Sequence, residues 1–506
     1  MKSDFDILDN FYMDLDKSQS YEITFLPARE LINSKRFDFF SVLIYIDHKV
    51  KGLDMSFATN LYKERVTAVT DGSFIEIGKS ESKNTFNKFT NTLDKLIEDF
   101  QKDNFDNDQS LIPIDADNFV LDGAHRVCCA AYFNRKIRVM KLSGLSTGWQ
   151  MDYNWLFNRS VSQKNLKRYA LEYCNYGKNL YFLVLWPKSF SNKKDKSRAL
   201  ELIENSCNVV HKSQINLSFN AIRNLMIQIY GHMDWVGSVE DNFEYTYAKA
   251  LDVYQKNKPT EFILVEGSDL TKVTNLKSEI RNVFDIGLNS VHSTDNPSET
   301  LQLANLIFNE NSIHHLLSAT PCRYKNSFKL VDKFKSIIVS SNENLNDFIV
   351  CGSSPLAIYG IRPSDDLDYI SIHENKLDYL FDNCLKIEND ENYKNLFSLN
   401  FQDIIFSPDN YFIFNDVKFI SLETLKSFKK VRGEKKDIND VKLITGFKNK
   451  NIVYKYHQFL NFNRVVSFKL YHSSWDKIYF LISLIPKPIK RIIKDIVKKI
   501  RSKVIL

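Results

Sequence analysis

Helical patterns alternate along this chain with short runs of β-branched or aromatic residues, and this alternation constrains the fold most. The runs include Tyr181–Leu185, Phe262–Val265, Ile337–Ser340 and Phe348–Val350. Such alternation predicts α/β or α+β units throughout. Because 506 residues exceed what one ordinary core organises, we expect a multidomain protein.

Polar clusters mark the expected boundaries between domains. One lies near Ser143–Gly148 and another near Ser318–Asn326, whereas Ser189–Ser197 is typical of a loop within a domain. These clusters predict four parts: 1–150, 151–325, 326–450 and a tail of 451–506.

The positive charge of the chain is concentrated near its C-terminal end. The net charge is +6, yet residues 477–506 contain nine Lys or Arg and one acidic residue, which leaves −2 for the first 476 residues. Because non-specific nucleic-acid binding depends on clustered positive charge, the near-neutral body predicts no nucleic-acid partner.

The tail has the pattern of a basic amphipathic helix. Its apolar residues from Ile489 to Val504 recur at helical spacing, and Lys and Arg occupy the remaining faces. This pattern predicts binding to an anionic membrane surface through 477–506, and the alternative is a helix docked on the body.

Several common classes of protein lack their usual signals here. Seven cysteines show no CxxC spacing, which predicts neither a zinc site nor a disulfide framework and fits a reducing cytoplasm. The acidic start and the lack of 18 consecutive apolar residues predict neither a cleaved secretion signal nor a membrane-spanning helix. No GxGxxG, GxxxxGK[ST], HExxH or GxSxG motif occurs. We therefore expect a cytoplasmic protein held peripherally on the inner membrane.

The first constellation of polar residues is Asp122-Gly-Ala-His-Arg126. The surrounding residues predict a strand at 111–114, a short strand at 119–121, a helix from Ala124 and a strand at 137–140. Backbone N–H groups at a helix start, with a guanidinium beside them, suit a bound phosphate. The alternative is an ordinary helix start, with Asp122 as a cap and Arg126 on the surface.

This pattern resembles the ParB/sulfiredoxin superfamily, closely over residues 85–142 and weakly over 20–84. The resemblance implies that Gly123, His125 and Arg126 bind nucleotide phosphates and that Glu76 is a candidate acid or base. Ala124 stands where sulfiredoxin carries its reactive cysteine, so sulfinic-acid repair is not expected.

The second constellation is Asn289-Ser-Val-His-Ser-Thr-Asp295, with Lys277 and Arg281 upstream. A neutral imidazole near cations that neutralise phosphate oxygens is a workable phosphoryl acceptor. The region resembles a remote nucleoside diphosphate kinase-like domain of ferredoxin-like fold. The resemblance implies His292 as the phosphoacceptor, with supporting contacts from Arg281, Asn289, Tyr230 and Lys188. A fold retained for binding only is the alternative.

The third constellation, Gly352-Ser353-Ser354 followed by Asp366 and Asp368, is the most specific signal in the chain. A strand leads into the Gly-Ser turn, and the period of a second strand places both carboxylates on one face. Paired carboxylates facing such a turn suit a divalent metal that bridges nucleotide phosphates.

Residues 335–446 resemble the nucleotidyltransferase superfamily, which shares the fold of DNA polymerase β. The resemblance implies that Gly352 and Ser353 hold phosphate, and that Asp366 and Asp368 bind Mg²⁺. It also implies a third metal carboxylate on a following strand, with Asp403 as first choice and Asp416 as second. Three further cations either meet phosphates or are solvated: Arg362, Lys435 and Lys436.

Together the three constellations predict a phosphoryl or nucleotidyl transferase. We expect it to act from a nucleoside triphosphate, ATP or CTP, on a small-molecule or glycan precursor in capsule or lipopolysaccharide biosynthesis. The alternatives are a nucleotide-gated ParB-like regulator and a defence or toxin nucleotidyltransferase that modifies RNA or protein. The oligomeric state is left open.

Overall fold

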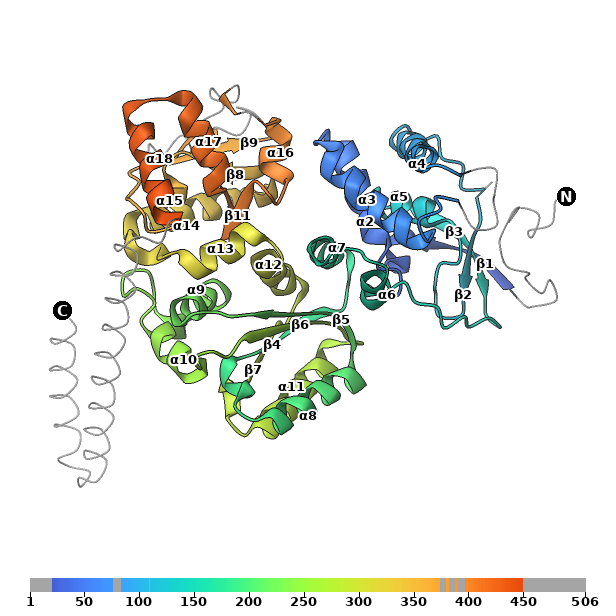
Figure 1. The fold of residues 1–506 in the computed structure, drawn as a ribbon, viewed down its shortest axis with the longest axis horizontal. Helices are drawn as coiled ribbons and strands as arrows, with labels where there is room; N and C mark the ends of the chain where they lie inside the picture. The colour runs from blue at the N-terminus through green and yellow to red at the C-terminus, as the bar shows by residue number, and fades with distance from the viewer. Residues whose placement is uncertain are drawn as a thin grey trace.

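The computed structural model describes residues 21–75, 83–108, 110–373, 379–381, 387–389, 396–397 and 399–448. Within them the chain forms 17 α-helices and three sheets (Figure 1), which confirms the predicted mixed α/β fold. Two predicted features, Glu76 and the amphipathic tail, lie outside the described residues.

The N-terminal sheet has three strands in the order β1-β3-β2. Strand β1 (Tyr21–Pro27) is antiparallel to β3 (Lys136–Leu142), which runs parallel to β2 (Ile112–Asp115). The α-helices of this part are α2 (Phe39–Lys51), α3 (Met55–Val69), α4 (Phe86–Gln101), α5 (Ala124–Tyr132), α6 (Tyr153–Asn158) and α7 (Gln163–Tyr176).

The middle sheet has four antiparallel strands in the order β5-β6-β4-β7. The strands are β4 (Leu180–Leu185), β5 (Asn208–Ile215), β6 (Thr260–Glu266) and β7 (Val291–Ser293). The α-helices between and after them are α8 (Lys193–Ser206), α9 (Phe219–Tyr230), α10 (Tyr245–Val253), α11 (Leu270–Phe284), α12 (Pro297–Ile307) and α13 (Glu310–Ser318).

The C-terminal sheet has five strands in the order β10-β9-β8-β12-β11. They are β8 (Phe348–Val350), β9 (Leu367–Ser371), β10 (Ile387–Asn389), β11 (Tyr411–Phe414) and β12 (Val417–Ile420). The α-helices of this part are α14 (Lys325–Ser340), α15 (Ser354–Ile358), α16 (Phe401–Phe406), α17 (Leu422–Arg432) and α18 (Lys435–Lys448).

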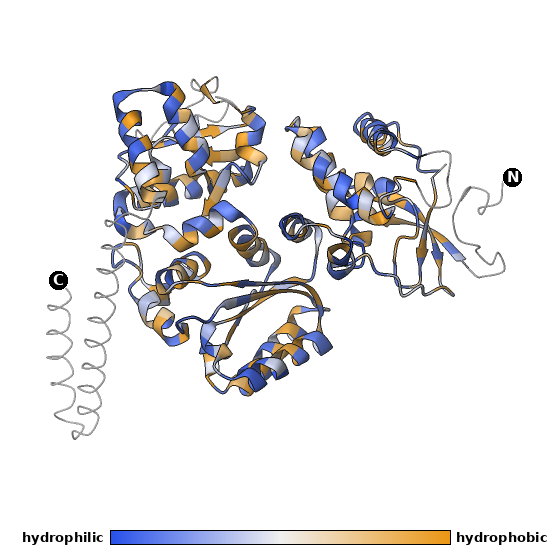
Figure 2. Ribbon diagram, viewed as in Figure 1, coloured by the Kyte–Doolittle hydropathy of each residue, from blue (hydrophilic) through white to orange (hydrophobic). Residues whose placement is uncertain are grey.

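Strand β4 is apolar on both faces because helices cover both sides of the middle sheet. Tyr181, Leu183 and Leu185 pack with residues of α8 and α11, whereas Phe182 and Val184 belong to a larger core on the other face. Figure 2 shows apolar residues along these strands and mixed faces on α8 and α11. Because side chains alternate between the two faces of a strand, β4 contributes to two separate cores.

The largest apolar core extends from Ala28 to Leu316 and joins the N-terminal helices to the middle sheet. A second core extends from Ile227 to Ile444 and joins α9 to the C-terminal sheet. Packing is thus continuous past residues 150 and 325, where the predicted domain boundaries lie.

The run Ile337–Ser340, predicted as an extended segment, is the last turn of helix α14. Phe328, Val331, Phe334 and Ile338 are all buried along this helix. Their spacing follows the helical period over the 16 residues of α14. This longer pattern outweighs the β propensity of the four-residue run Ile337–Ser340.

Candidate functional site

The Gly-Ser turn of the third constellation meets the predicted carboxylates directly. Gly352 follows β8 with a φ of +60°, and a Cβ on it would overlap the carboxylate of Asp368. The backbone N–H of Cys351 donates to the carbonyl oxygen of Asp368 at 2.8 Å. Only glycine permits this approach, because it lacks a Cβ and tolerates a positive φ.

Asp366 approaches the same turn from the residue before β9. Its Oδ1 lies 3.4 Å from the Ser353 hydroxyl and 3.3 Å from the Ser364 hydroxyl, and these two hydroxyls bond each other. Both aspartates are half-buried. The structure therefore brings together four predicted residues, Gly352, Ser353, Asp366 and Asp368.

The two candidates for a third carboxylate lie elsewhere. The segment around Asp403, expected as a strand, forms helix α16, and the Asp403 Oδ1 accepts from the backbone N–H of Asp54 at 2.9 Å. Asp416 occupies the hairpin turn between β11 and β12 with a φ of +63°, and its Oδ2 lies 2.7 Å from the Lys335 Nζ. Both carboxylates thus bond other groups, Asp403 the backbone of the N-terminal part and Asp416 a lysine of α14.

Strand register gives Asp368 a different acidic neighbour. Glu388 of β10 is its partner in the parallel pairing with β9, so both side chains leave the sheet on one face. In the described part of the chain, no three His, Cys, Asp or Glu side chains are arranged to hold a metal ion.

The cation Arg362 is committed to an ion pair rather than solvated. Its Nε and Nη2 bond the two carboxylate oxygens of Asp440 on α18 at 2.6 and 2.8 Å. Lys429 of α17 lies 2.9 Å from the second of these oxygens and 3.1 Å from Asp437. Although burial opposes it, bonds from Arg362 and Lys429 lower the pKa of Asp440.

The other two predicted phosphate-contacting cations of this region are on the surface at the start of α18. Lys436 lies 3.3 Å from Glu434, with 64% of its side chain exposed, and Lys435 is also exposed. The network of Arg362, Lys429 and Asp440 ties the loop before Asp366 to α17 and α18.

His292 lies on β7, and its Nδ1 is 2.9 Å from the hydroxyl of Tyr230 on α9. The two rings meet edge to face at 5.2 Å. Burial, with Lys277, Arg281 and Lys249 nearby, lowers the pKa of His292 to about 3, so the imidazole is neutral at physiological pH. Burial raises the pKa of the Tyr230 hydroxyl.

The cations around His292 come from two helices. Lys277 and Arg281 are one turn apart on α11, and the Nε of Arg281 is buried without a hydrogen-bond partner. Lys249 of α10 donates to Asn289 Oδ1 at 2.7 Å. This cluster favours an anionic ligand next to a neutral imidazole.

Only two of the four predicted supporting residues lie next to His292. Tyr230 and Arg281 lie beside the imidazole, whereas Lys188 is exposed in a 3₁₀ turn after β4, and no hydrogen bond or ion pair joins it to His292. Asn289 contributes indirectly, because its side-chain oxygen holds Lys249.

The Asp122–Arg126 turn forms the predicted helix start. Gly123 precedes α5 with a φ of +86°, and a Cβ there would overlap the side chains of Ile112 and Arg126. Arg126 donates to the Ser110 hydroxyl at 3.0 Å and lies 3.4 Å from Asp122. Arg126 thus lies against the turn, next to the backbone N–H groups at the start of α5.

His125 points toward α3, where its Nε2 lies 2.7 Å from the hydroxyl of Tyr62. Burial, together with Lys83 and Arg65, holds the pKa of His125 well below its usual value. Behind it, Asp38 is fully buried and paired with Arg36 and Arg65 at 2.8 and 2.7 Å. Arg36 also donates to the carbonyl of Val120, so this ion cluster supports the strand before the turn.

Some residues of these sites carry no sequence signal of their role. Lys249 is 43 residues before His292, and Tyr62 is 63 before His125. Only Ser364, two residues before Asp366, had a local signal, because a serine beside a carboxylate at a strand start is a ready hydrogen-bond donor.

A cavity of about 690 Å³ lies between α2, α7 and the β11–β12 hairpin. Its lining includes Asp47, Glu172, Asn305 and Lys418. Burial, with Asp47 nearby, raises the pKa of Glu172 to about 7, and burial lowers the pKa of Lys418 to about 7.

Comparison with protein-family models, curated proteins and solved structures found no match. No helix among the described residues combines the length and apolar character needed to cross a membrane.

Proposed function

We propose that this protein is a nucleotidyltransferase. Its reaction centre is formed by the Gly-Ser turn and the two aspartates: Gly352, Ser353, Asp366 and Asp368. The observation that carries this proposal is the close contact at Gly352, where the Asp368 carboxylate occupies the position that a Cβ would take. A close backbone approach beside two carboxylates suits a triphosphate and its metal.

The carboxylate pair fits Mg²⁺, because this ion is commonly held by one or two carboxylates together with substrate phosphates. Asp366 and Asp368 would hold it, with Glu388 as the acidic neighbour on β10. When bound, Mg²⁺ supplies positive charge that neutralises the phosphates. The Ser353 hydroxyl and the glycine backbone orient the nucleotide.

The reaction is a displacement at phosphorus. A hydroxyl oxygen of a small-molecule or glycan acceptor attacks the α-phosphorus, the bond to the β-phosphate oxygen breaks, and pyrophosphate leaves. The hydroxyl proton passes to solvent. The acceptor class and a setting in surface-polysaccharide synthesis at the inner membrane are part of this proposal, and they rest on the basic tail.

The test is Mg²⁺-dependent release of pyrophosphate from ATP or CTP. Asp366→Asn and Asp368→Asn should each abolish release, whereas Asp365→Asn, an exposed neighbour, is the matched control and should retain it. Unchanged release in either of the first two variants would remove the nucleotidyltransferase proposal.

A second activity, phosphoryl transfer through His292, has its own support. The neutral imidazole is surrounded by Lys249, Lys277 and Arg281, and one guanidinium nitrogen is unpartnered. The Tyr230 hydroxyl is hydrogen-bonded to Nδ1 of His292. When Nδ1 carries the proton and donates to the tyrosine oxygen, Nε2 has the lone pair and is the nucleophile. The strand order β5-β6-β4-β7 supports a ferredoxin-like fold for this part.

In this reaction Nε2 attacks the γ-phosphorus of ATP, a phosphoramidate forms and ADP leaves. Incubation with γ-labelled ATP should give acid-labile label that His292→Ala loses, while His314→Ala, a half-buried histidine on α13, should keep it. Absence of label in the wild type would end this second proposal.

The Gly123–Arg126 turn is proposed as a further nucleotide-phosphate site, supported by its glycine and the start of α5. The two alternatives, a nucleotide-gated ParB-like regulator and a defence or toxin nucleotidyltransferase, rank lower because the near-neutral body disfavours the first and the basic tail disfavours the second.

A further inference from the structure

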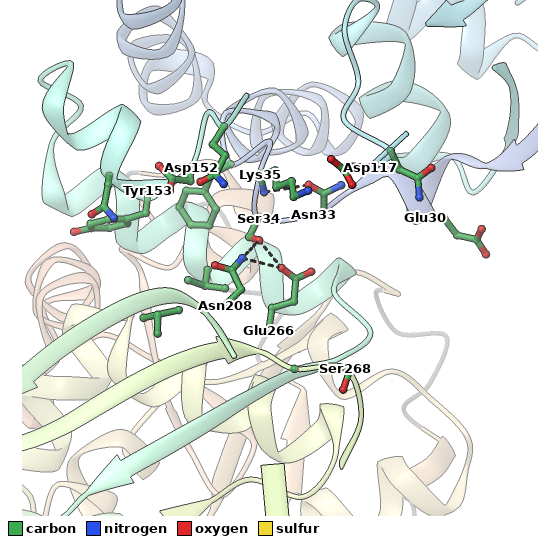
Figure 3. Close-up of a pocket in the computed structure, with 17 residues that line it drawn as sticks. Glu30, Asn33, Ser34, Lys35, Asp117, Asp152, Tyr153, Asn208, Glu266 and Ser268 are labelled. Atoms are coloured by element: carbon green, nitrogen blue, oxygen red, sulfur yellow. Dashed lines mark hydrogen bonds between the residues drawn. The ribbon is translucent and has the colours of Figure 1, made fainter. Parts of the chain in front are cut away.

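A polar cavity of about 520 Å³ lies where the N-terminal part meets the edge of the middle sheet (Figure 3). One wall comes from the segment after β1 and the turn at Asp117, and the other from the ends of β5 and β6. Its volume is in the range of small-molecule sites, which often occur between domains. None of the described residues beyond Ser268 lines it.

The lining is dominated by groups that both donate and accept hydrogen bonds. Carboxamides donate through nitrogen and accept through oxygen, as sugar hydroxyls also do, so the two kinds of group are complementary. Five side chains of this type line the cavity: Asn33, Asn118, Gln150, Asn154 and Asn208.

The charged groups of the cavity are mainly acidic. Four carboxylates, Glu30, Asp117, Asp152 and Glu266, face it with one cation, Lys35. A cavity with this balance repels phosphorylated ligands, whereas carboxylates accept readily from hydroxyl groups.

Part of the cavity is already organised by hydrogen bonds between the two walls. Asn208 Nδ2 donates to the Ser34 hydroxyl at 2.6 Å, and Ser34 in turn donates to Glu266. The other oxygen of Glu266 accepts from the Tyr173 hydroxyl at 2.7 Å. Figure 3 shows Ser34, Asn208 and Glu266 joined across the gap.

Two amide side chains of the cavity have no internal partner. Gln150 and Asn154 are exposed, and neither makes a side-chain hydrogen bond within the described part of the chain. Between them lies Tyr153, whose ring packs edge to face on Phe37 at 6.3 Å, and both rings line the cavity. The cavity thus pairs free amides with an aromatic surface.

From these features we infer that this cavity binds a neutral polyhydroxylated ligand of sugar or polyol type. The amides and carboxylates bond its hydroxyl groups, and Tyr153 packs against its carbon skeleton. A charged phosphate ester is excluded by the acidic lining, and an apolar ligand would leave the amides unpaired.

This site is separate from the phosphoryl centre. Glu266 pairs with Leu180 at one end of β4, whereas His292 pairs with Val184 toward the other end. Four residues of strand separate them, about 14 Å. The inference therefore does not depend on either proposed transfer reaction.

The test is ligand binding to the full chain by saturation-transfer NMR and calorimetry. The neutral probes are D-glucose, N-acetyl-D-glucosamine and ribitol, and the anionic probe is glucose 6-phosphate. At least one neutral probe should bind at least about tenfold more tightly than glucose 6-phosphate.

The variant that tests the site is the double substitution Gln150→Ala with Asn154→Ala. Because these side chains have no internal partner, the thermal midpoint should stay unchanged while affinity for the neutral probe falls about tenfold to a hundredfold. Asn305→Ala, an amide in the other cavity, is the matched control and should bind like the wild type.

Any of four results would overturn the inference. They are no saturable binding of a neutral probe, tighter binding of glucose 6-phosphate, unchanged affinity in the double variant, or equal loss in Asn305→Ala.

Discussion

The buried ion cluster of Asp38 with Arg36 and Arg65 supports the Gly123 turn, so it offers a sharp test of how this part is held together. Asp38 is fully buried, while the two arginines are 4% and 5% exposed. Asp38→Asn removes the negative charge and leaves two buried guanidinium groups uncompensated. Breaking such a cluster costs about 3 kcal/mol or more at pH 7.

The pH dependence follows from the pKa of Asp38. Although burial opposes it, Arg36 and Arg65 lower this pKa to about 2 from 3.8. A lowered carboxyl pKa stabilises the fold above pH 3.8, by about 2 kcal/mol, and this contribution is lost as the pH falls through 2. The difference in stability between wild type and Asp38→Asn should therefore shrink as the pH falls from 3.8 through 2.

The assay is hydrogen exchange of peptides from α2 and α3, because it reports local stability in a large chain. A loss of about 3 kcal/mol raises the exchange rate at pH 7 about a hundredfold. Asp103→Asn is the control, because its ion pair with Arg135 is exposed and Asn tolerates its φ of +60°. Equal exchange rates in Asp38→Asn and Asp103→Asn would refute this reasoning. A difference between wild type and Asp38→Asn that is as large at pH 2 as at pH 7 would also refute it.

Two further predictions concern other parts of the protein. Gly352→Ala should lower the thermal midpoint, because the positive φ adds about 1–3 kcal/mol of strain. It should also reduce Mg²⁺-dependent pyrophosphate release, because the new Cβ displaces the Asp368 carboxylate. Retained release would contradict this prediction. Since burial raises the pKa of Glu172 to about 7, ionisation destabilises the fold as the pH rises from 4.5 through 7. Glu172→Gln should therefore stabilise the fold at pH 8 by up to about 3 kcal/mol, measured as a higher thermal midpoint, and should have little effect at pH 4; an equal gain at both pH values would contradict it.

Local elements around the sites follow from the sequence. The helix at Ala124 and the strand before Gly352 have the predicted positions, whereas the strand predicted to carry both aspartates begins at Leu367 and includes only Asp368. The signals act within a few residues, because a glycine with positive φ or a period of two needs no distant partner.

The third carboxylate shows where such reasoning fails. The pattern around Asp403 is compatible with a strand, yet capping by Asn400 and packing make it a helix. Asp416 lies in a two-residue turn with Asn415, both at positive φ. Glu388 becomes the neighbour of Asp368 through strand register, which no local spacing encodes.

By itself, the sequence determined the mixed α/β character, the positions of the glycine turns and the concentration of positive charge near the C-terminal end. Tertiary structure alone decided that Lys249 reaches the surroundings of His292, that Arg362 pairs with Asp440, and that Ser34 meets Glu266 across a polar cavity. The physical reason is range: backbone sterics and side-chain periodicity act between near neighbours, whereas ion pairs and cavities arise only where packing brings distant segments together.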